Sequence, residues 1–349
     1  MDTSQPVRSQ IATGVERVVD RVKRISFFLA LLLLLTALCG CGKAPSTSST
    51  FYLMDTVITV TLYTDDNDLA SAVFAECRTL LSELDALWAR QTEGSEIARF
   101  NQATDSLSGL DVRTVSLLQT ALEVSEATDG AFDITVAPLV DLWARCGEEN
   151  RLPTEAELQA VIGYRHLTLH GDTLAKSDPA VKIDLGGIGK GAAISHLIAY
   201  LESTEVCGGL VTFGSNVAVF GEKPSGEDFR VAIRDPKDAN GTVGTLTLRG
   251  GEVLSVSGDY ERYVTVDGRQ YHHILDPATG YPADTGLSSV AVIARDGALA
   301  DALSTALFVM GAEAAIALYH SGVYAFEAVL VGSDGALTLT DGAAAVFEQ

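Results

Sequence analysis

The sequence predicts an α+β fold in which mostly antiparallel sheets are flanked by helices. From residue 164 onward, short strand-like segments follow one another and are punctuated by Gly, Pro, Asn and Asp. Helix-like segments interrupt them only after Lys190, from Ala298 to Met310 and from Ala312 to His320. Because strands mostly follow strands, the pattern favours antiparallel pairing over a doubly wound parallel sheet.

Length and charge restrict the classes of partner. The 349 residues suffice for one large domain or two small ones, and the 47% hydrophobic content is that of a globular protein. The formal net charge of −22 argues against nucleic-acid binding and against adsorption to anionic lipid. Since basic residues are scarce, a small anionic ligand would need a metal ion or helix N-termini to receive it.

The N-terminus has the pattern of an exported lipoprotein. Basic residues precede a largely apolar run of fourteen, Ile25 to Leu38, which is typical of a secretory signal and short for a membrane span. Leu38, Gly40 and Cys41 then resemble a bacterial lipobox. This predicts a signal peptide over residues 1–40 and a lipid anchor at Cys41 on the extracytoplasmic face of the cell membrane. The alternative, an uncleaved anchor, also places the body outside the cytoplasm.

A small polar tether, residues 41–50, precedes the predicted domain at residues 51–349. Early in that domain we expect a strand at Phe51–Thr64 and helices at Asp68–Arg90, Thr114–Thr128 and Thr154–Ile162. The five cysteines show neither zinc-site nor redox-motif spacing.

A glycine-rich stretch, Asp184–Gly191, lies between a strand-like run at Ala180–Ile183 and a helix-like run at Ala192–Leu201. Its glycines allow close backbone approach, and the N-terminus of the following helix suits a phosphate or pyrophosphate. The nucleotide P-loop spacing is absent, because Gly191 and not Ser or Thr follows Lys190. A dinucleotide reading would need parallel strands that the pattern does not favour. The alternative is a tight turn that closes a strand–helix unit.

Two further stretches carry candidate chemistry. Asp301 and Thr305 share one face of a helix, so their oxygens can ligate a hard cation such as Mg²⁺ together with phosphates and water. The alternative is an Asp near a helix start and a Thr bonded to the helix backbone. His272 and His273 are adjacent on a strand and so face opposite sides, which leaves only one of them to act as a general base at a given site. The alternative is a solvent histidine beside a packed one.

From about Phe51 to the C-terminus, the chain resembles the ApbE family, the FAD:protein FMN transferases. Seven stretches in the family's order carry the resemblance: 54–56 (MDT), 94–101 (GSEIARFN), 130–135 (GAFDIT), 184–191 (DLGGIGKG), 257–260 (SGDY), 273–280 (HILDPATG) and 300–306 (ADALSTA). The resemblance implies an α+β architecture related to the T-fold. It also implies Mg²⁺-dependent transfer of FMN from FAD, through its phosphate, to a Ser or Thr hydroxyl of a target protein, with release of AMP.

The resemblance also implies roles for individual residues. Asp301, Thr305 and the carbonyl of Gly187 would hold Mg²⁺, and His273 would take the proton from the acceptor hydroxyl. Lys190 would meet the phosphates, and Asp184 the ribose or adenine. The full set of implied FAD contacts is Met54, Ala131, Phe132, Asp133, Asp184, Lys190 and Ile274.

The chain departs from the family pattern at three positions, Asp55, Ser215 and Gln91, where we expect altered contact with the flavin. The implied partners are exported FMN-binding domains of membrane electron-transport complexes that carry a Ser/Thr flavinylation motif. Two alternatives remain: a pyrophosphatase that converts FAD to FMN and AMP, and a flavin-binding lipoprotein without chemistry. A pure binder would need neither a metal ligand pair nor a base.

Overall fold

The computed structural model describes residues 45–349. The predicted signal peptide and Cys41 lie outside the described residues. The helices are α2 (Asn67–Trp88), α3 (Glu96–Gln102), α4 (Val112–Ala127), α5 (Ala137–Glu149), α6 (Glu155–Leu158), α7 (Gly189–Glu202), α8 (Gly297–Ser321) and α9 (Asp341–Val346), with 3₁₀ turns η1 (Ile134–Val136) and η2 (Tyr164–His166). The strands are β1 (Thr47–Leu53), β2 (Thr56–Leu62), β3 (Ser106–Leu107), β4 (Leu167–His170), β5 (Thr173–Lys176), β6 (Gly208–Phe213), β7 (Asn216–Gly221), β8 (Phe229–Arg234), β9 (Thr242–Leu248), β10 (Val253–Gly258), β11 (Tyr263–Val266), β12 (Arg269–His272), β13 (Leu287–Ala294), β14 (Glu327–Gly332), β15 (Leu337–Leu339) and β16 (Phe347–Glu348).

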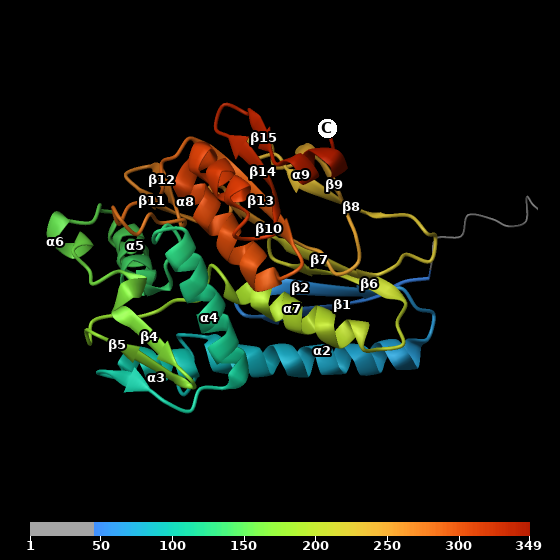
Figure 1. The fold of residues 1–349 in the computed structure, drawn as a ribbon, viewed down its shortest axis with the longest axis horizontal. Helices are drawn as coiled ribbons and strands as arrows, with labels where there is room; N and C mark the ends of the chain where they lie inside the picture. Colours follow the sequence, from blue (N-terminus) through green and yellow to red (C-terminus); the bar gives the residue numbers. More distant parts are fainter. Residues whose placement is uncertain (1–44) are drawn as a thin grey trace, which may run out of the picture. The chain divides into compact units, whose positions relative to one another are not determined.

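A single eight-stranded sheet organises these elements, in the order β1-β2-β6-β7-β10-β13-β14-β15 (Figure 1). Every neighbouring pair in it is antiparallel, so the predicted α+β class with antiparallel sheets is confirmed. Strand β13 is buried along its whole length because it is covered on both faces. It reads as a continuous apolar and small-residue run for that reason.

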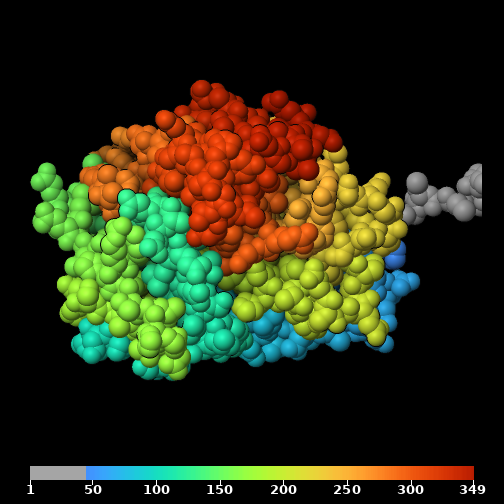
Figure 2. Space-filling model, viewed as in Figure 1, coloured from blue at the N-terminus to red at the C-terminus, as the bar shows by residue number. Residues whose placement is uncertain are grey.

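Two layers cover the sheet. One apolar cluster joins it to α2, α4, α7 and α8, and a second joins its other face to the small sheet β16-β9-β8. Figure 2 shows the orange to red C-terminal segments packed directly against the teal α4 and the yellow-green α7 regions. Helix α8 is long and apolar enough for a membrane span, but half of its most apolar window is buried in the domain, as is typical of a core helix.

The first strand prediction was wrong in detail. Instead of one strand over Phe51–Thr64, the chain forms the hairpin β1–β2 around Met54 and Asp55, both with positive φ (51° and 54°). A two-residue turn with positive φ at both positions matches the twist of the strands that it joins. Asp tolerates positive φ better than most residues. Strand β1 also includes residues 47–50, which composition assigned to the tether. Their hydroxyls pair across the hairpin, with Thr50 Oγ1 lying 3.2 Å from Thr59 Oγ1.

Other differences follow from local chemistry. Residues 180–184 were predicted as a strand but form none. The Ile183 N–H donates to the Asn101 side chain, and the Val181 N–H donates to the Asp178 carbonyl within a turn, so neither pairs with a strand. Helix α5 was not predicted, since Pro138 suggests a break but in fact lies at the helix start, where its missing N–H costs nothing. The two predicted helices on either side of Gly311 are confirmed. Within α8 that residue has the non-helical angles φ 79° and ψ 168°, which divide α8 into two helical segments.

Helices α7 and α8 touch through glycine. A Cβ at Gly191 would overlap the carbonyl oxygen of Gly297 and would lie 2.6 Å from Cβ of Asp301. No side chain fits there without separating the helices. The contact therefore sets the distance between the glycine-rich stretch and the face of α8 that carries Asp301.

Replacing Gly191 with alanine is expected to lower the free energy of unfolding by about 3 kcal/mol, because a well-packed contact must open. The matched control is Gly189→Ala in the same helical turn, where the nearest atom to the new Cβ would be 3.8 Å away. Urea unfolding followed by circular dichroism measures both. Equal midpoints for the two variants would contradict the close-packing argument.

Candidate active site

All the site residues predicted within the domain line one cleft of about 570 Å³. Its walls come from the β1–β2 turn, the end of α2, the segment 131–133, the glycine-rich stretch and the helix face of α8. The segments around Ser257 and His273 complete it. Six of the seven sequence stretches, which are spread over some 250 residues, thus contribute to a single cleft.

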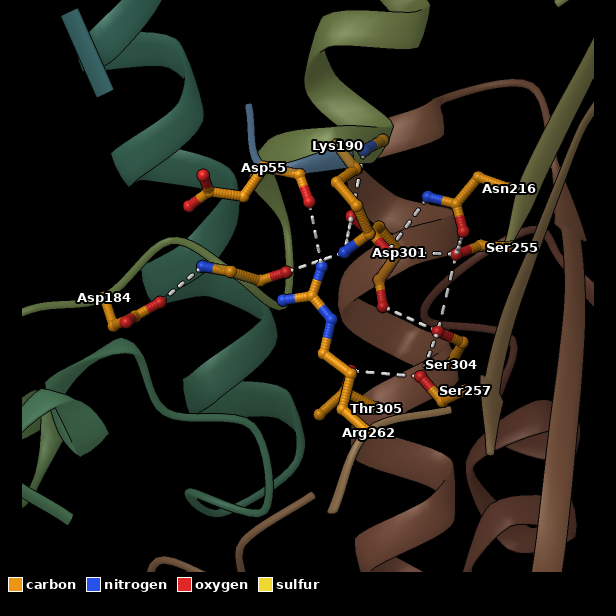
Figure 3. A network of polar contacts seen from close by, with 12 residues as sticks. Asp55, Asp184, Lys190, Asn216, Ser255, Ser257, Arg262, Asp301, Ser304 and Thr305 are labelled. Carbon is orange, nitrogen blue, oxygen red and sulfur yellow. Dashed lines mark hydrogen bonds and ion pairs between the residues drawn. The ribbon is translucent and has the colours of Figure 1, made fainter. Parts of the chain in front are cut away.

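The glycine-rich stretch is fixed by an ion-pair chain. The Asp184 carboxylate accepts from the Gly186 N–H (2.6 Å) and lies 2.5 Å from Nε of Arg90, which also pairs with Asp141 at 2.8 Å. Lys190 donates to the Gly186 carbonyl at 2.8 Å, and its ammonium lies 3.6 Å from Asp301 (Figure 3). A positive charge therefore already faces the predicted metal-binding carboxylate.

Asp301 is held from both sides although it is only 4% exposed. One carboxylate oxygen accepts from the Gly191 N–H at 2.9 Å, at the positive end of the α7 dipole. The other accepts from the Asn216 amide (3.1 Å) and from the Ser255 hydroxyl (3.0 Å). Sequence reasoning gave neither Asn216 nor Ser255 a role, since nothing local ties either one to the α8 motif.

A chain of hydroxyls joins Asp301 to Thr305. Ser257 lies 2.8 Å from Ser304 and 3.3 Å from Thr305, and Ser304 donates to the Asp301 carbonyl at 2.8 Å (Figure 3). A Cβ at Gly187 would lie 3.5 Å from Thr305 Oγ1, so the stretch and the helix face are adjacent. The network fixes the hydroxyls of this face, and Gly187, whose carbonyl is the third predicted donor, lies next to Thr305.

These donors fit a hard cation. They are a carboxylate, a hydroxyl and a backbone carbonyl, the oxygen ligands that Mg²⁺ prefers when substrate phosphates complete its shell. Within residues 45–349 no cluster of three His, Cys, Asp or Glu side chains forms. The Lys190 ammonium beside Asp301 shows that positive charge is accommodated at this point.

The two histidines have separate environments. His273 lines the cleft, and its Nδ1 donates to the Arg262 carbonyl at 3.1 Å, which leaves Nε2 as the acceptor in the neutral ring. Burial lowers the pKa of His273 to about 4, and the charges of Lys190 and Arg262 act in the same direction. His272 instead donates to the Ala283 carbonyl (3.0 Å) and packs edge-on against Phe308.

Two predicted FAD contacts are already engaged within the protein. The buried Asp133 carboxylate accepts from the N–H and hydroxyl of Thr135 (2.8 and 2.6 Å) and from the Tyr164 N–H (2.6 Å). Burial raises its pKa. Asp184 is similarly paired with Arg90. Both carboxylates therefore shape the cleft wall, and in this conformation they do not extend freely towards a ligand.

The cleft also contains residues that sequence reasoning treated as departures or missed. Asp55, Gln91 and Ser215 all line it. So do the guanidinium groups of Arg90 and Arg262, and Arg262 reaches the Asp55 carbonyl at 3.4 Å. Their sequence positions could have pointed to these two arginines. Basic residues are scarce in this chain, and Arg90 and Arg262 each lie within a few residues of a recognised stretch.

Comparison with known proteins places this cleft in a described family. The model of the ApbE family matches residues 54–330. The FAD:protein FMN transferase of Vibrio cholerae serotype O1 is 34% identical over 275 residues, which cover 75% of this chain and 82% of that protein. The Escherichia coli K12 protein of the same name is 35% identical, over 68% and 71%. The crystal structure of the ApbE protein from Thermotoga maritima superposes with a TM-score of 0.79 at 30% identity, covering 87% of this chain and all of that one.

Proposed function

The chain belongs to the ApbE family, and from this we propose that it transfers FMN from FAD to a Ser or Thr hydroxyl of a target protein, with Mg²⁺ and with release of AMP. One observation carries the proposal: a single cleft joins the N-terminus of α7, the Asp301–Thr305 face and His273. In this proposal the N-terminus of α7 would bind the pyrophosphate, Asp301 and Thr305 would ligate the cation, and His273 would act as the base.

Asp301, Thr305 and the Gly187 carbonyl would hold the cation. Bound there, Mg²⁺ would neutralise the FAD pyrophosphate and polarise the attacked phosphorus. The N-terminus of α7 offers backbone N–H groups to the same phosphates. Lys190 is close enough to Asp301 to exchange that carboxylate for a phosphate oxygen when FAD enters.

The remaining step is a displacement at phosphorus. The acceptor hydroxyl oxygen attacks the phosphorus of the FMN half, and the bond from that phosphorus to the bridging oxygen breaks. The bridging oxygen leaves with AMP, and the hydroxyl proton passes to Nε2 of His273. The Nδ1–H of His273 donates to the Arg262 carbonyl, so the proton of the neutral ring stays on Nδ1. Nε2 is therefore free to accept the hydroxyl proton.

The lowered pKa of His273 predicts how kcat/KM depends on pH. A base must be neutral to accept a proton, and a pKa lowered to about 4 keeps the ring neutral well below the usual range. The value of kcat/KM is therefore expected to stay level as the pH falls and to decline only near the lowered pKa. FAD binding and circular dichroism at each pH serve as controls for lost metal ligation or unfolding. A decline centred near the ordinary histidine pKa of about 6.5 would contradict the assignment.

The decisive experiment uses residues 45–349 with FAD, Mg²⁺ and an FMN-binding domain that carries a Ser/Thr motif. Intact mass spectrometry of that domain is expected to show a gain equal to FMN minus water, lost when Mg²⁺ is chelated. Release of AMP and free FMN without a mass gain would indicate that water is the acceptor, and thus a pyrophosphatase. Tight FAD binding without AMP would refute both enzymatic functions.

We also propose that the enzyme acts from the extracytoplasmic face of the membrane, anchored by lipid at Cys41. The basic and apolar segments before Cys41 and the lipobox-like residues Leu38 and Gly40 support this. The targets would then be exported FMN-binding domains of membrane electron-transport complexes.

A further inference from the structure

The stretch Gly94–Asn101 has no role in the chemistry described above. It covers most of α3 and includes Ser95, which caps that helix, but none of its residues lines the cleft. Its two ends nevertheless bond to Ala89, the residue before Arg90, and to Ile183, the residue before the glycine-rich stretch.

The Asn101 side chain holds the residue directly before Asp184. Its Oδ1 accepts from the Ile183 N–H at 2.7 Å, and its Nδ2 donates to the Ile183 carbonyl at 2.9 Å. This paired donation and acceptance replaces the bonds that a neighbouring strand would make. It explains why residues 180–184 keep a defined path without belonging to a sheet.

The other end of the stretch holds the residue next to Arg90. The Ser95 hydroxyl donates to the Ala89 carbonyl at 2.7 Å, where α2 ends. Arg90 follows and places its Nε 2.5 Å from the Asp184 carboxylate. The stretch therefore approaches Asp184 from two sides, through the backbone of Ile183 and through the ion pair with Arg90.

We propose that Asn101 is a positioning residue for FAD and cation binding, which holds the segment from Asp184 to Gly187 so that the Gly187 carbonyl and the start of α7 face the cleft. The inference rests on the proposed function, because it concerns the same site. Asn101 touches no substrate and acts only through Ile183. The competing reading is that its two hydrogen bonds contribute to stability alone.

Asn101→Ala is expected to weaken FAD affinity between about tenfold and a hundredfold, as the loss of two hydrogen bonds would if both act on binding. The KM for FAD should rise by a similar factor, while kcat at saturating FAD changes much less, since His273 and Asp301 are untouched. Quenching of flavin fluorescence on titration with protein, with Mg²⁺ and without acceptor, measures the affinity directly.

Asn101→Asp supplies a readout that a purely structural role would not move. Its carboxylate accepts from the Ile183 N–H but repels the Ile183 carbonyl, and protonation restores an O–H donor. FAD affinity of this variant is therefore expected to rise when the pH is lowered from about 7 to about 5, towards the pKa of an aspartic acid. The wild type and Asn101→Ala should show no such rise.

The outcomes separate cleanly. FAD affinity of Asn101→Ala equal to that of the wild type would overturn the inference. If that variant unfolds at the assay temperature, Asn101→Asp decides alone, and an affinity that does not change with pH overturns it. A wild type that binds no FAD would instead refute the proposed function. Normal transfer by the wild type with unaffected Asn101 variants would refute only the positioning role.

Discussion

Asp301→Ala is expected to lower the rate of flavin transfer by about a thousandfold or more. Asp301 is the only carboxylate among the three proposed cation ligands. A cation at a phosphoryl centre stabilises the transition state by several kcal/mol, and about 1.4 kcal/mol corresponds to a tenfold change in rate. The change also leaves the Gly191 N–H, Asn216 and Ser255 without their shared acceptor. The mass of the acceptor protein, followed over time at several Mg²⁺ concentrations, measures the loss.

Two further variants separate charge from folding. Asp301→Asn keeps one acceptor oxygen, which can serve Asn216 and Ser255 but not also the Gly191 N–H, and it removes the charge. It should therefore lose transfer while retaining more of the thermal stability than Asp301→Ala. Asp296→Asn is the matched control on the same helix, where the residue caps α8 through the Ala298 N–H at 2.9 Å and lies outside the cleft. It should transfer flavin at the wild-type rate. Retained transfer in Asp301→Asn would refute cation ligation by this residue.

His273→Ala is expected to lower kcat by between about a hundredfold and ten-thousandfold, the usual contribution of a positioned general base. FAD affinity should stay near that of the wild type, because the alanine removes neither a proposed metal ligand nor a backbone donor. Single-turnover transfer with saturating FAD and acceptor gives the rate, and flavin fluorescence gives the affinity.

The neighbouring histidine is the matched control. His272→Gln retains an N–H donor that can reach the Ala283 carbonyl, and the ring it replaces lies outside the cleft. Transfer should remain near the wild-type rate. Equal losses in the two variants would show that the strand end, and not the Nε2 of His273, limits the reaction.

Much of the fold follows from local pattern. Helices α2, α4 and α7 appear close to where the apolar spacing predicts them, since helical hydrogen bonds join residues only four apart. The break at Gly311 is equally local, because its left-handed φ suits glycine. The hairpin turn at Met54 and Asp55 was missed because methionine gives no sign of positive φ.

The candidate site was only partly visible in the sequence. Asp301, Thr305, His273 and the glycine-rich stretch were recognised because their residue types and their order match a known family. Asn216 and Ser255 were not, since a buried amide and a hydroxyl have no distinctive pattern of their own. Asp184 was assigned to the ligand, and that assignment stays a prediction; its pairing with Arg90 across some ninety residues of chain was not foreseen.

The sequence by itself therefore determined the antiparallel α+β class, the family and the residues that carry the proposed chemistry. Only the tertiary structure decided how they meet: the contact of α7 with α8 at Gly191, the pairing of Asn101 with Ile183, and the orientation of His273 by Arg262. The physical reason is the range of the interactions. Periodicity records hydrogen bonds between near neighbours, but long-range polar contacts depend on how the packed core brings distant segments together.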